Sequence, residues 1–304
     1  MVRNSRWRKP PGSIGRSSAV RERQTPPCQV GLGVCNHLDV KVVTIMRVLL
    51  TNDDGISAPG MAALYHAAAD LGVCTVIAPA QVRSAASHAV TFHKPIPVGS
   101  RTIPDAAGQP LFTGLAVDGN PADCVKLAVT ELLAEPVDLV LSGINSGANV
   151  GVNVIYSGTI AAAREAAILG LPAIAVSLHV GAKSKIDWPR TSAITRTILQ
   201  RILALKLEPA TLLSVNIPIL DDGKEPRGLR VLPVSTSALN DAYECSDGPQ
   251  GDRHYQASAG FSFQRQDQDT DVAALFAGYV TVSPLLFDPT DAPGVKMWSR
   301  RLAE

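Results

Sequence analysis

The sequence predicts an α/β fold, with a mostly parallel sheet, helices on both of its faces and a β-rich extension at the C-terminal end. Short apolar runs alternate with segments of helical period from residue 46 to about residue 218. Polar loops follow several of these runs directly, as at the carboxyl ends of parallel strands. After residue 218 the alternation stops, and charged turns separate short β-like pieces.

The first elements are a strand, a helix and a second strand. The run 48–51 is short, apolar and partly β-branched, which indicates a buried strand. Ser57 and Pro59 are helix-start residues, and apolar residues then recur at helical spacing until Gly72. The run 73–78, closed by a proline, is the second strand.

The next stretch is less regular. Residues 89–118 are expected to contain a strand pair, around Pro95 and at 111–117. An Asp-Gly-Asn-Pro turn at 118–121 then opens a helix over 122–133.

Regular alternation returns after residue 136. A buried strand at 137–141 leads into the glycine-rich loop 142–151. An alanine-rich helix over 157–169 and a strand at 173–178 come next. The last pair of this half is a long helix at 188–205 followed by a strand at 212–217.

The C-terminal part, 219–304, is predicted to be an antiparallel extension of the core 46–218, used in joining subunits. It carries fewer helix signals than the core, and its β-like pieces are 229–234, 255–257 and 280–286. The two parts together form one predicted domain, 46–304.

Residues 1–45 are predicted to be a disordered basic extension, because they are rich in Arg, Ser and Pro and show no helical or strand period. No apolar core of a secretory signal follows the basic start; a transit peptide and a translation start at Met46 are two interpretations, of which we expect the second. Cys28, Cys35 and His37 lack a fourth ligand at a zinc-site spacing.

The charge distribution argues against nucleic-acid binding by residues 46–304. Residues 1–45 hold eight Lys or Arg and two acids, whereas the rest of the chain holds 20 basic and 25 acidic residues. Five cysteines without a repeated spacing predict a reducing, cytoplasmic setting. No apolar run is long enough to span a membrane, so no membrane partner is expected.

Polar side chains directly follow three of the predicted strands. Open α/β sheets bind their ligands at these carboxyl ends of the strands. Adjacent carboxylates that converge at a strand end repel each other unless a cation lies between them. Oxygen and amide ligands without His or Cys suit magnesium, manganese or calcium better than zinc. The three loops supply, in chain order, Asp53 and Asp54; Arg83, Ser84 and Ser87; and Asn145 and Asn149.

Ser157, Gly158 and Thr159 place hydroxyls and free N–H groups at a helix N-terminus, which is an arrangement that binds phosphate. A cation site beside a phosphate pocket predicts metal-assisted phosphoryl chemistry. Each signal also has a structural interpretation: an acidic turn at the aspartates, and a simple helix cap at Ser157. His88 and His93 are predicted to be ordinary loop histidines.

The order of these motifs resembles the SurE family, the survival-protein nucleotidases, over about residues 46–290. The residues that carry the resemblance are Asn52-Asp53-Asp54-Gly55, Ala58-Pro59-Gly60, Arg83-Ser84 with Ser87, Pro121-Ala122-Asp123-Cys124, Ser142-Gly143-Ile144-Asn145, Tyr156-Ser157-Gly158-Thr159 and Gly278 to Leu285.

The resemblance implies a Rossmann-like core and a metal-dependent phosphoric monoester hydrolase, a 5'-nucleotidase that releases phosphate from nucleoside 5'-monophosphates. One divalent cation per subunit, magnesium or manganese, and a homodimer or homotetramer joined through the C-terminal part are also implied. Carried over by position, the catalytic residues are Asp53 and Asp54, the cation ligands Asp53, Asp54, Ser84 and Asn145, and the phosphate-binding residues Asn149, Ser157, Gly158 and Thr159.

Three positions depart from the family pattern: Ala80, Ala85 and Asn120. They put loop shape and substrate preference in doubt, and leave the expected cation ligands intact. Two other functions stay open at this point. One is a nucleotide-binding regulatory protein that uses the same pocket without turnover, and the other is a scaffold whose basic tail binds nucleic acid.

Overall fold

The described part of the chain, in a computed structural model, comprises residues 45–181, 185–219, 224–249, 251–258, 262–265 and 267–303. Its strands are β1 (Met46–Thr51), β2 (Gly72–Pro79), β3 (Val98–Pro104), β4 (Pro110–Val117), β5 (Leu139–Ser146), β6 (Ala173–Leu178), β7 (Leu212–Ile217), β8 (Leu229–Val231), β9 (Ala242–Asp247), β10 (Arg253–Ser258) and β11 (Val280–Leu285). Its helices are α1 (Pro59–Ala68), α2 (Pro121–Leu127) with the π-helical turn η1 (Ala128–Leu132), α3 (Asn153–Tyr156), α4 (Gly158–Ile168), α5 (Trp188–Leu203), α6 (Asp271–Phe276) and α7 (Ala292–Arg301).

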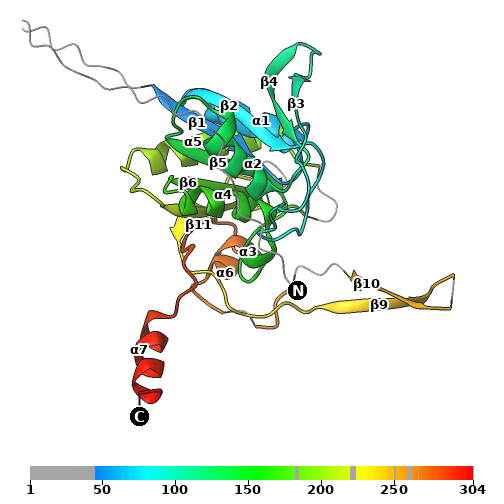
Figure 1. The fold of residues 1–304 in the computed structure, drawn as a ribbon, viewed down its shortest axis with the longest axis vertical. Coiled ribbons are helices and arrows are strands. Elements are labelled where there is room, and N and C mark those ends of the chain that lie inside the picture. Colours follow the sequence, from blue (N-terminus) through cyan, green and yellow to red (C-terminus); the bar gives the residue numbers. More distant parts are fainter. Residues whose placement is uncertain are drawn as a thin grey trace, which may run out of the picture. The chain divides into compact units, whose positions relative to one another are not determined.

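Nine of these strands form one sheet in the order β3-β4-β2-β1-β5-β6-β7-β11-β8 (Figure 1). Its centre is parallel: β1 pairs with β2 on one side and with β5 on the other, and β6 and β7 continue in the same direction. The predicted α/β class with a mostly parallel sheet is therefore confirmed.

The strand order reverses between β1 and β5. The chain moves outward from β1 to β2 and β4, and then returns to the other side of β1 to form β5. Ligands of open α/β sheets bind outside the carboxyl ends of the strands at such a reversal. Residues just after Thr51, and those at the Ser146 end of β5, therefore border the expected crevice.

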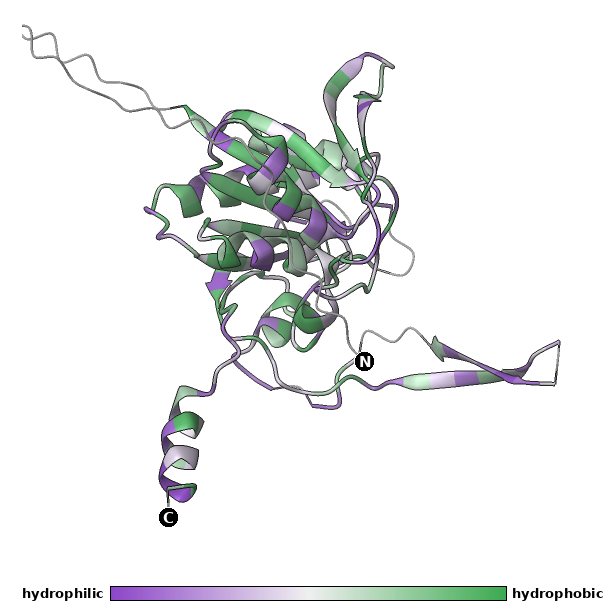
Figure 2. Cartoon of the chain, viewed as in Figure 1, coloured by the Kyte–Doolittle hydropathy of each residue, from purple (hydrophilic) through white to green (hydrophobic). Residues whose placement is uncertain are grey.

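Each face of the sheet is covered by a pair of helices, because successive strand side chains point to opposite faces. On β1, Val48 and Leu50 pack in the core that includes α1 and α5, whereas Leu49 packs in the core of α2 and α4. Alanines such as Ala163 and Ala167 form the buried face of α4 and meet small residues of β6. The sheet strands are largely hydrophobic in Figure 2, as strands buried on both faces must be.

Two details of the core differ from the sequence prediction. The strand expected around Pro95 is β3, which begins at Val98; Pro95 and Pro97 have no N–H to donate to a ladder, and they precede the strand. The single helix expected over 122–133 ends as α2 at Leu127 and continues as the π-helical turn η1.

The C-terminal part contributes strands to the sheet of the core. β11 pairs antiparallel with β7 and parallel with β8, so both strands extend the main sheet. β9 and β10 form a hairpin of their own. The sequence does not predict α6 and α7, since the first has six residues and the second buries little of its apolar surface.

The predicted extension 1–45 lies outside the described residues except for Ile45. In the part of the chain that the structure describes, none of the helices combines the length and the apolar character that a membrane span requires.

Candidate active site

A tight turn follows β1 and presents two carboxylates. Asn52 closes this turn, because its side chain donates to Gly55 O at 2.9 Å and accepts from Gly55 N at 3.1 Å. Gly55 has a φ of +95°, a backbone conformation that residues with a Cβ rarely adopt. The turn thus directs Asp53 and Asp54 to the end of the sheet where its strand order reverses.

Asp53 is enclosed by the start of helix α4. Its side chain is buried, and its Oδ1 accepts a 2.6 Å hydrogen bond from the hydroxyl of Thr159. A Cβ added at Gly158 would lie 2.8 Å from Cβ of Asp53 and 2.9 Å from its Oδ2, so only glycine fits at this position. Asp54 is less buried, and its Oδ2 accepts a 3.3 Å hydrogen bond from Ser146 N.

The environment of Asp53 disfavours a negative charge. The pKa of Asp53 is raised to about 6, chiefly because the carboxyl is buried; the hydrogen bond from Thr159 opposes this effect, and the charge of Asp54 adds to it. A cation bound between the two carboxylates would favour the charged form of Asp53.

The second predicted loop, after β2, is anchored beside Asp53. Arg83 N donates a 2.7 Å hydrogen bond to Asp53 O, and the Arg83 guanidinium pairs with Asp118 at 2.7 Å. Ser87 donates from its hydroxyl to Ile155 O at 2.8 Å. Ser84, between these anchors, is exposed and lines the cavity described below. Arg83 and Ser87 therefore hold the loop, and Ser84 faces the site.

A bulge at the end of β5 brings the third loop to the site. The β5–β6 register shifts between Ser142 and Asn145, and a Cβ at Gly143 would clash with Val176 O. The side-chain nitrogen of Asn145 donates to Gly147 O at 2.7 Å. Because the nitrogen is used in this bond, the side-chain oxygen of Asn145 is the atom available to a cation.

Asn149 is held by a buried polar network. Its backbone N donates to the Asn216 side chain at 2.8 Å, and the Asn216 amide donates back to Asn149 O at 3.1 Å. The Asn149 side-chain nitrogen donates to Ser177 Oγ at 2.8 Å. Asn216 and Ser177 lie on the neighbouring strands β7 and β6, and the sequence analysis did not single them out.

Ser157 caps helix α4, since its hydroxyl accepts a 3.1 Å hydrogen bond from Ile160 N. It also lines the cavity. Thr159 is fully buried behind Asp53, and Gly158 is packed against the same carboxylate. Of the three residues predicted to bind phosphate at this helix start, Ser157 is therefore the one whose side chain borders the cavity.

These loops enclose a cavity of about 260 Å³ at the reversal of the strand order. The lining residues that the structure describes are Asp53, Asp54, Ser84, Ala85, Asn145, Ser146, Ala148, Asn149, Asn153, Tyr156 and Ser157. The fold thus brings all four predicted cation ligands and two predicted phosphate-binding residues to one place. Asn153 was missed, and Tyr156 was named only as part of a motif without a role in the site; the signal for both was their place between the glycine-rich loop and the helix cap.

His88 is more than an isolated loop histidine. Its Nε2 lies 2.8 Å from Oε2 of Glu165 on α4, and Lys126 lies 3.0 Å from Oε1 of the same carboxylate. These contacts lower the pKa of Glu165, the hydrogen bond with His88 most of all. Together they fasten the loop that carries Ser84 to the helix that begins at the site.

The cavity offers oxygen ligands to a cation. No group of three His, Cys, Asp or Glu side chains gathers at one point among the described residues. A cation held here would therefore take two carboxylates together with hydroxyl and amide oxygens, a set suited to magnesium or manganese. A larger cavity, of about 470 Å³, lies elsewhere, between α1, α5 and the turn after β3, and it lacks this cluster.

The chain is similar to known proteins over most of its length. A sequence model of the family described as "Survival protein SurE" matches residues 48–241. The chain is 39% identical to a protein named 5'-nucleotidase SurE from Heliobacterium modesticaldum, over 81% of this chain and 88% of that protein. It is 41% identical to one of the same name from Carboxydothermus hydrogenoformans, over 81% and 92%.

A solved structure shares the fold. The crystal structure of the SurE protein from Aquifex aeolicus covers 85% of this chain and 100% of its own, with a TM-score of 0.69 and 34% identity. A match of this extent, with the predicted motifs assembled around one cavity, assigns the family. The chain belongs to the SurE family.

Proposed function

We propose that this protein is a metal-dependent 5'-nucleotidase that hydrolyses nucleoside 5'-monophosphates to a nucleoside and phosphate. The observation that carries the proposal is the convergence of Asp53, Asp54, Ser84, Asn145 and Ser157 on one cavity. The names of the relatives, 5'-nucleotidase SurE, support the reaction and its substrate class.

Asp53, Asp54, Ser84 and Asn145 would hold the cation, one per subunit. The raised pKa of Asp53 supports this assignment, because a cation offsets the cost of a buried charge next to Asp54. When bound, the cation would neutralise charge on the phosphate and would lower the pKa of a water molecule beside it. Magnesium and manganese are the ions that we propose.

The chain's own residues supply orientation. Thr159 holds one oxygen of Asp53 through its hydroxyl, and this bond favours the charged form of the carboxylate. Asn149 and Ser157 border the cavity on its phosphate side, where the start of α4 favours negative charge. The network behind Asn149 fixes that residue before the substrate arrives, which reduces the entropy that binding would cost.

We also propose that the protein assembles as a homodimer or homotetramer through the part after residue 218. Tyr243 and Tyr255 on the β9–β10 hairpin are about two-thirds exposed, at 66% and 64%. On α7, Met297 and Trp298 are exposed as well. Helix α7 carries both hydrophobic and hydrophilic residues in Figure 2. Exposed aromatic and apolar side chains of this kind are typical of protein interfaces.

The decisive experiment measures phosphate release from a panel of nucleoside 5'-monophosphates by the purified protein, with manganese, with magnesium and with EDTA. We expect release with a divalent cation and loss of release with EDTA. Binding of a nucleotide without turnover would instead identify a regulatory protein. Turnover that ignores EDTA would refute the metal dependence.

A further inference from the structure

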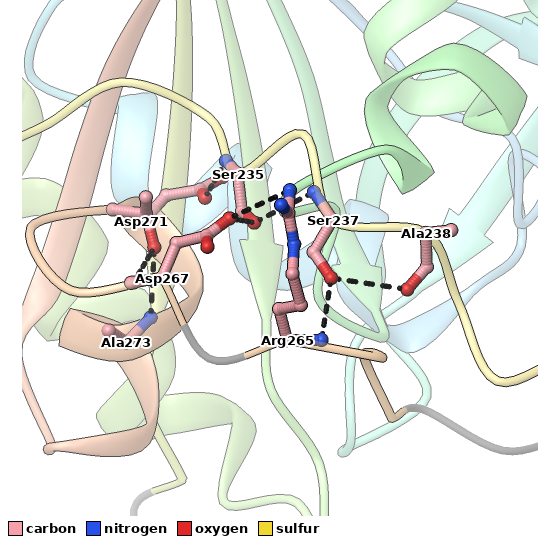
Figure 3. Close-up of polar contacts among 8 residues, drawn as sticks. Ser235, Ser237, Ala238, Arg265, Asp267, Asp271 and Ala273 are labelled. Atoms are coloured by element: carbon pink, nitrogen blue, oxygen red, sulfur yellow. Dashed lines mark hydrogen bonds and ion pairs between the residues drawn. The ribbon is translucent and has the colours of Figure 1, made fainter.

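The carboxylate of Asp271, at the start of α6, is buried and bonded to three backbone N–H groups. Its Oδ2 accepts from Gly151 N at 2.8 Å, and its Oδ1 accepts from Ser235 N and from Val272 N, each at 2.8 Å. The side chain of Asp271 is 1% exposed. Figure 3 shows Asp271 beside Ser235, at the junction of α6 with the segment that follows β8.

Gly151 belongs to the loop that forms one wall of the active-site cavity. Asn149 and Asn153, two residues on either side of it, both line that cavity. Val150 packs in a small core with Val272 and Leu275 of α6. The Asp271 carboxylate therefore connects α6 directly to the loop between two cavity-lining side chains.

Gly151 fits closely against its surroundings. It has a φ of +56°, and a Cβ at this position would lie 2.7 Å from Cε1 of Phe263 and 3.1 Å from Cγ2 of Val272. The loop is thus clamped by packing on one side and by a hydrogen bond to a carboxylate on the other. The clamp at Gly151 therefore adds to the hold that Asn216 and Ser177 have on Asn149, and it fixes the loop on the side of Asn153 as well.

The helix explains only part of the role of Asp271: an acid in the first turn is favoured by the helix dipole, and one of its three hydrogen bonds comes from Val272 N of α6. Thr270 is the N-cap of α6, and its side chain accepts from Ala273 N. Burial raises the pKa of Asp271, which means that enclosing its charge costs free energy. A carboxylate retained at this cost makes hydrogen bonds to two segments far away in the sequence, near residues 151 and 235.

We propose that Asp271 is a positioning residue of the active site, which holds the loop 147–153 so that Asn149 and Asn153 keep their places at the phosphate side of the cavity. This inference rests on the proposed nucleotidase function. Asp271 lies outside residues 48–241, the segment that the family model matches. Through Asp271, the C-terminal part would act on the site by way of the loop 147–153, in addition to the assembly proposed for it.

The test is Asp271→Asn, which keeps the size of the side chain. The remaining carbonyl oxygen can still accept from Ser235 N and Val272 N, whereas the new amide nitrogen faces Gly151 N and cannot accept from it. Loss of this hydrogen bond releases the loop at Gly151, and a small misplacement of binding residues is enough to slow an enzyme severalfold or more. We therefore expect kcat/KM for adenosine 5'-monophosphate to fall by about tenfold or more, chiefly through a higher KM.

Two controls separate positioning from stability. Asp267→Asn removes a nearby negative charge, because Asp267 also contacts Ser235: it accepts a 3.3 Å hydrogen bond from the Ser235 hydroxyl. Among the hydrogen bonds found in the described residues, Asp267 has none to the loop 147–153. Ile202→Val removes one methylene group from the buried face of α5, near the C-terminal end of that helix and far from the site. Both should keep the wild-type KM when all proteins are assayed well below their melting temperatures.

Amide hydrogen exchange gives a readout that does not depend on turnover. The Gly151 amide should be protected in the wild-type protein and should exchange faster in Asp271→Asn, but not in the two controls. Equal exchange or an unchanged KM in Asp271→Asn would overturn the inference. If the variant does not fold, the wild-type protein decides: an unprotected Gly151 amide overturns the inference and a protected one supports it. A wild-type protein without nucleotidase activity would refute the proposed function, and the exchange data would still test the Asp271 contact.

Discussion

The hydroxyl of Thr159 donates a 2.6 Å hydrogen bond to Oδ1 of Asp53, across 106 residues of chain. Both side chains are buried, so water does not compete for the bond. The bond holds the carboxylate in one orientation at the cavity and favours its charged form, against the effects of burial and of Asp54.

Replacing Thr159 with Val keeps the shape of the side chain but removes the hydroxyl. Since the hydrogen bond lowers the pKa of Asp53, its loss should raise that pKa above the value of about 6 in the metal-free protein. Carboxyl NMR titration of metal-free protein measures the shift directly. Thr159→Ser, which keeps the hydroxyl, should titrate nearly as wild type. Superimposable titrations of the Val and Ser variants would contradict the assigned bond.

Gly158→Ala should greatly reduce the activity of the enzyme. The added Cβ would lie 2.8 Å from Cβ of Asp53, so either the carboxylate or the start of α4 must shift. A misplacement of about 1 Å can cost about a hundredfold in rate, and we expect a loss of this order in kcat/KM. Gly99→Ala is the matched control, because a Cβ there has no heavy atom within 4 Å among the described residues. A Gly158→Ala enzyme as active as the control would refute the close contact.

Asp54→Asn should weaken cation binding and slow turnover. Asn suits a turn about as well as Asp does, so the backbone should tolerate the change. If the cation supplies several kcal/mol to the transition state, turnover should fall by about a hundredfold or more, with partial rescue by excess manganese. In EDTA the melting temperature should stay equal or rise, because Asp53 no longer faces a second negative charge.

Phosphate release across a manganese titration and thermal unfolding in EDTA test both expectations for Asp54→Asn. Asp105→Asn, in the exposed turn between β3 and β4, is the control for a simple Asp-to-Asn change in a turn. Wild-type turnover of Asp54→Asn at low manganese would end the cation assignment.

Glu165→Gln should destabilise the protein in a pH-dependent way. Contacts with His88 and Lys126 lower the pKa of Glu165, so its charge stabilises the folded state above the unfolded pKa of about 4.3. That contribution is lost as the pH falls through the lowered folded pKa. We expect a difference of about 1.5–3 kcal/mol from wild type at neutral pH, shrinking as the medium becomes strongly acidic.

Urea unfolding of Glu165→Gln at several pH values measures this difference. Glu135→Gln is the control: Glu135 pairs with Arg47 at the surface, with 66% of its side chain exposed, and it should contribute about 0–1 kcal/mol. A pH-independent difference for Glu165→Gln would mean that the Glu165 charge contributes no stability.

Assembly through the C-terminal part predicts a mass above that of one 32.0 kDa chain. Trp298 on α7 is 54% exposed, and Trp298→Glu should lower the mass measured by light scattering if this face is an interface. Lys296→Glu, on the same helix, changes charge without removing an apolar side chain and should assemble more nearly as wild type. A wild-type monomer at micromolar concentration would refute the proposed assembly.

Sequence alone identified the elements that local patterns encode. Burial on both faces of a parallel sheet requires continuous apolar runs, and these runs located β1, β2, β5, β6 and β7 to within a few residues. Asp53 and Asp54 were found as site candidates because they directly follow such a strand. Elements with weak local signals were missed: α6 has six residues, and the apolar residues of α7 are largely exposed.

Only the tertiary structure decided which residues line the cavity and which residues position them. Thr159 was predicted to bind phosphate, and the fold turns its hydroxyl to Asp53. Asn216 and Asp271 support the loop 147–153 from positions 67 and 120 residues away from their partners. Local periodicity in a sequence records which side chains are buried, but hydrogen bonds between distant segments depend on strand order and helix packing. Those contacts exist only once the sheet has brought its strand ends together.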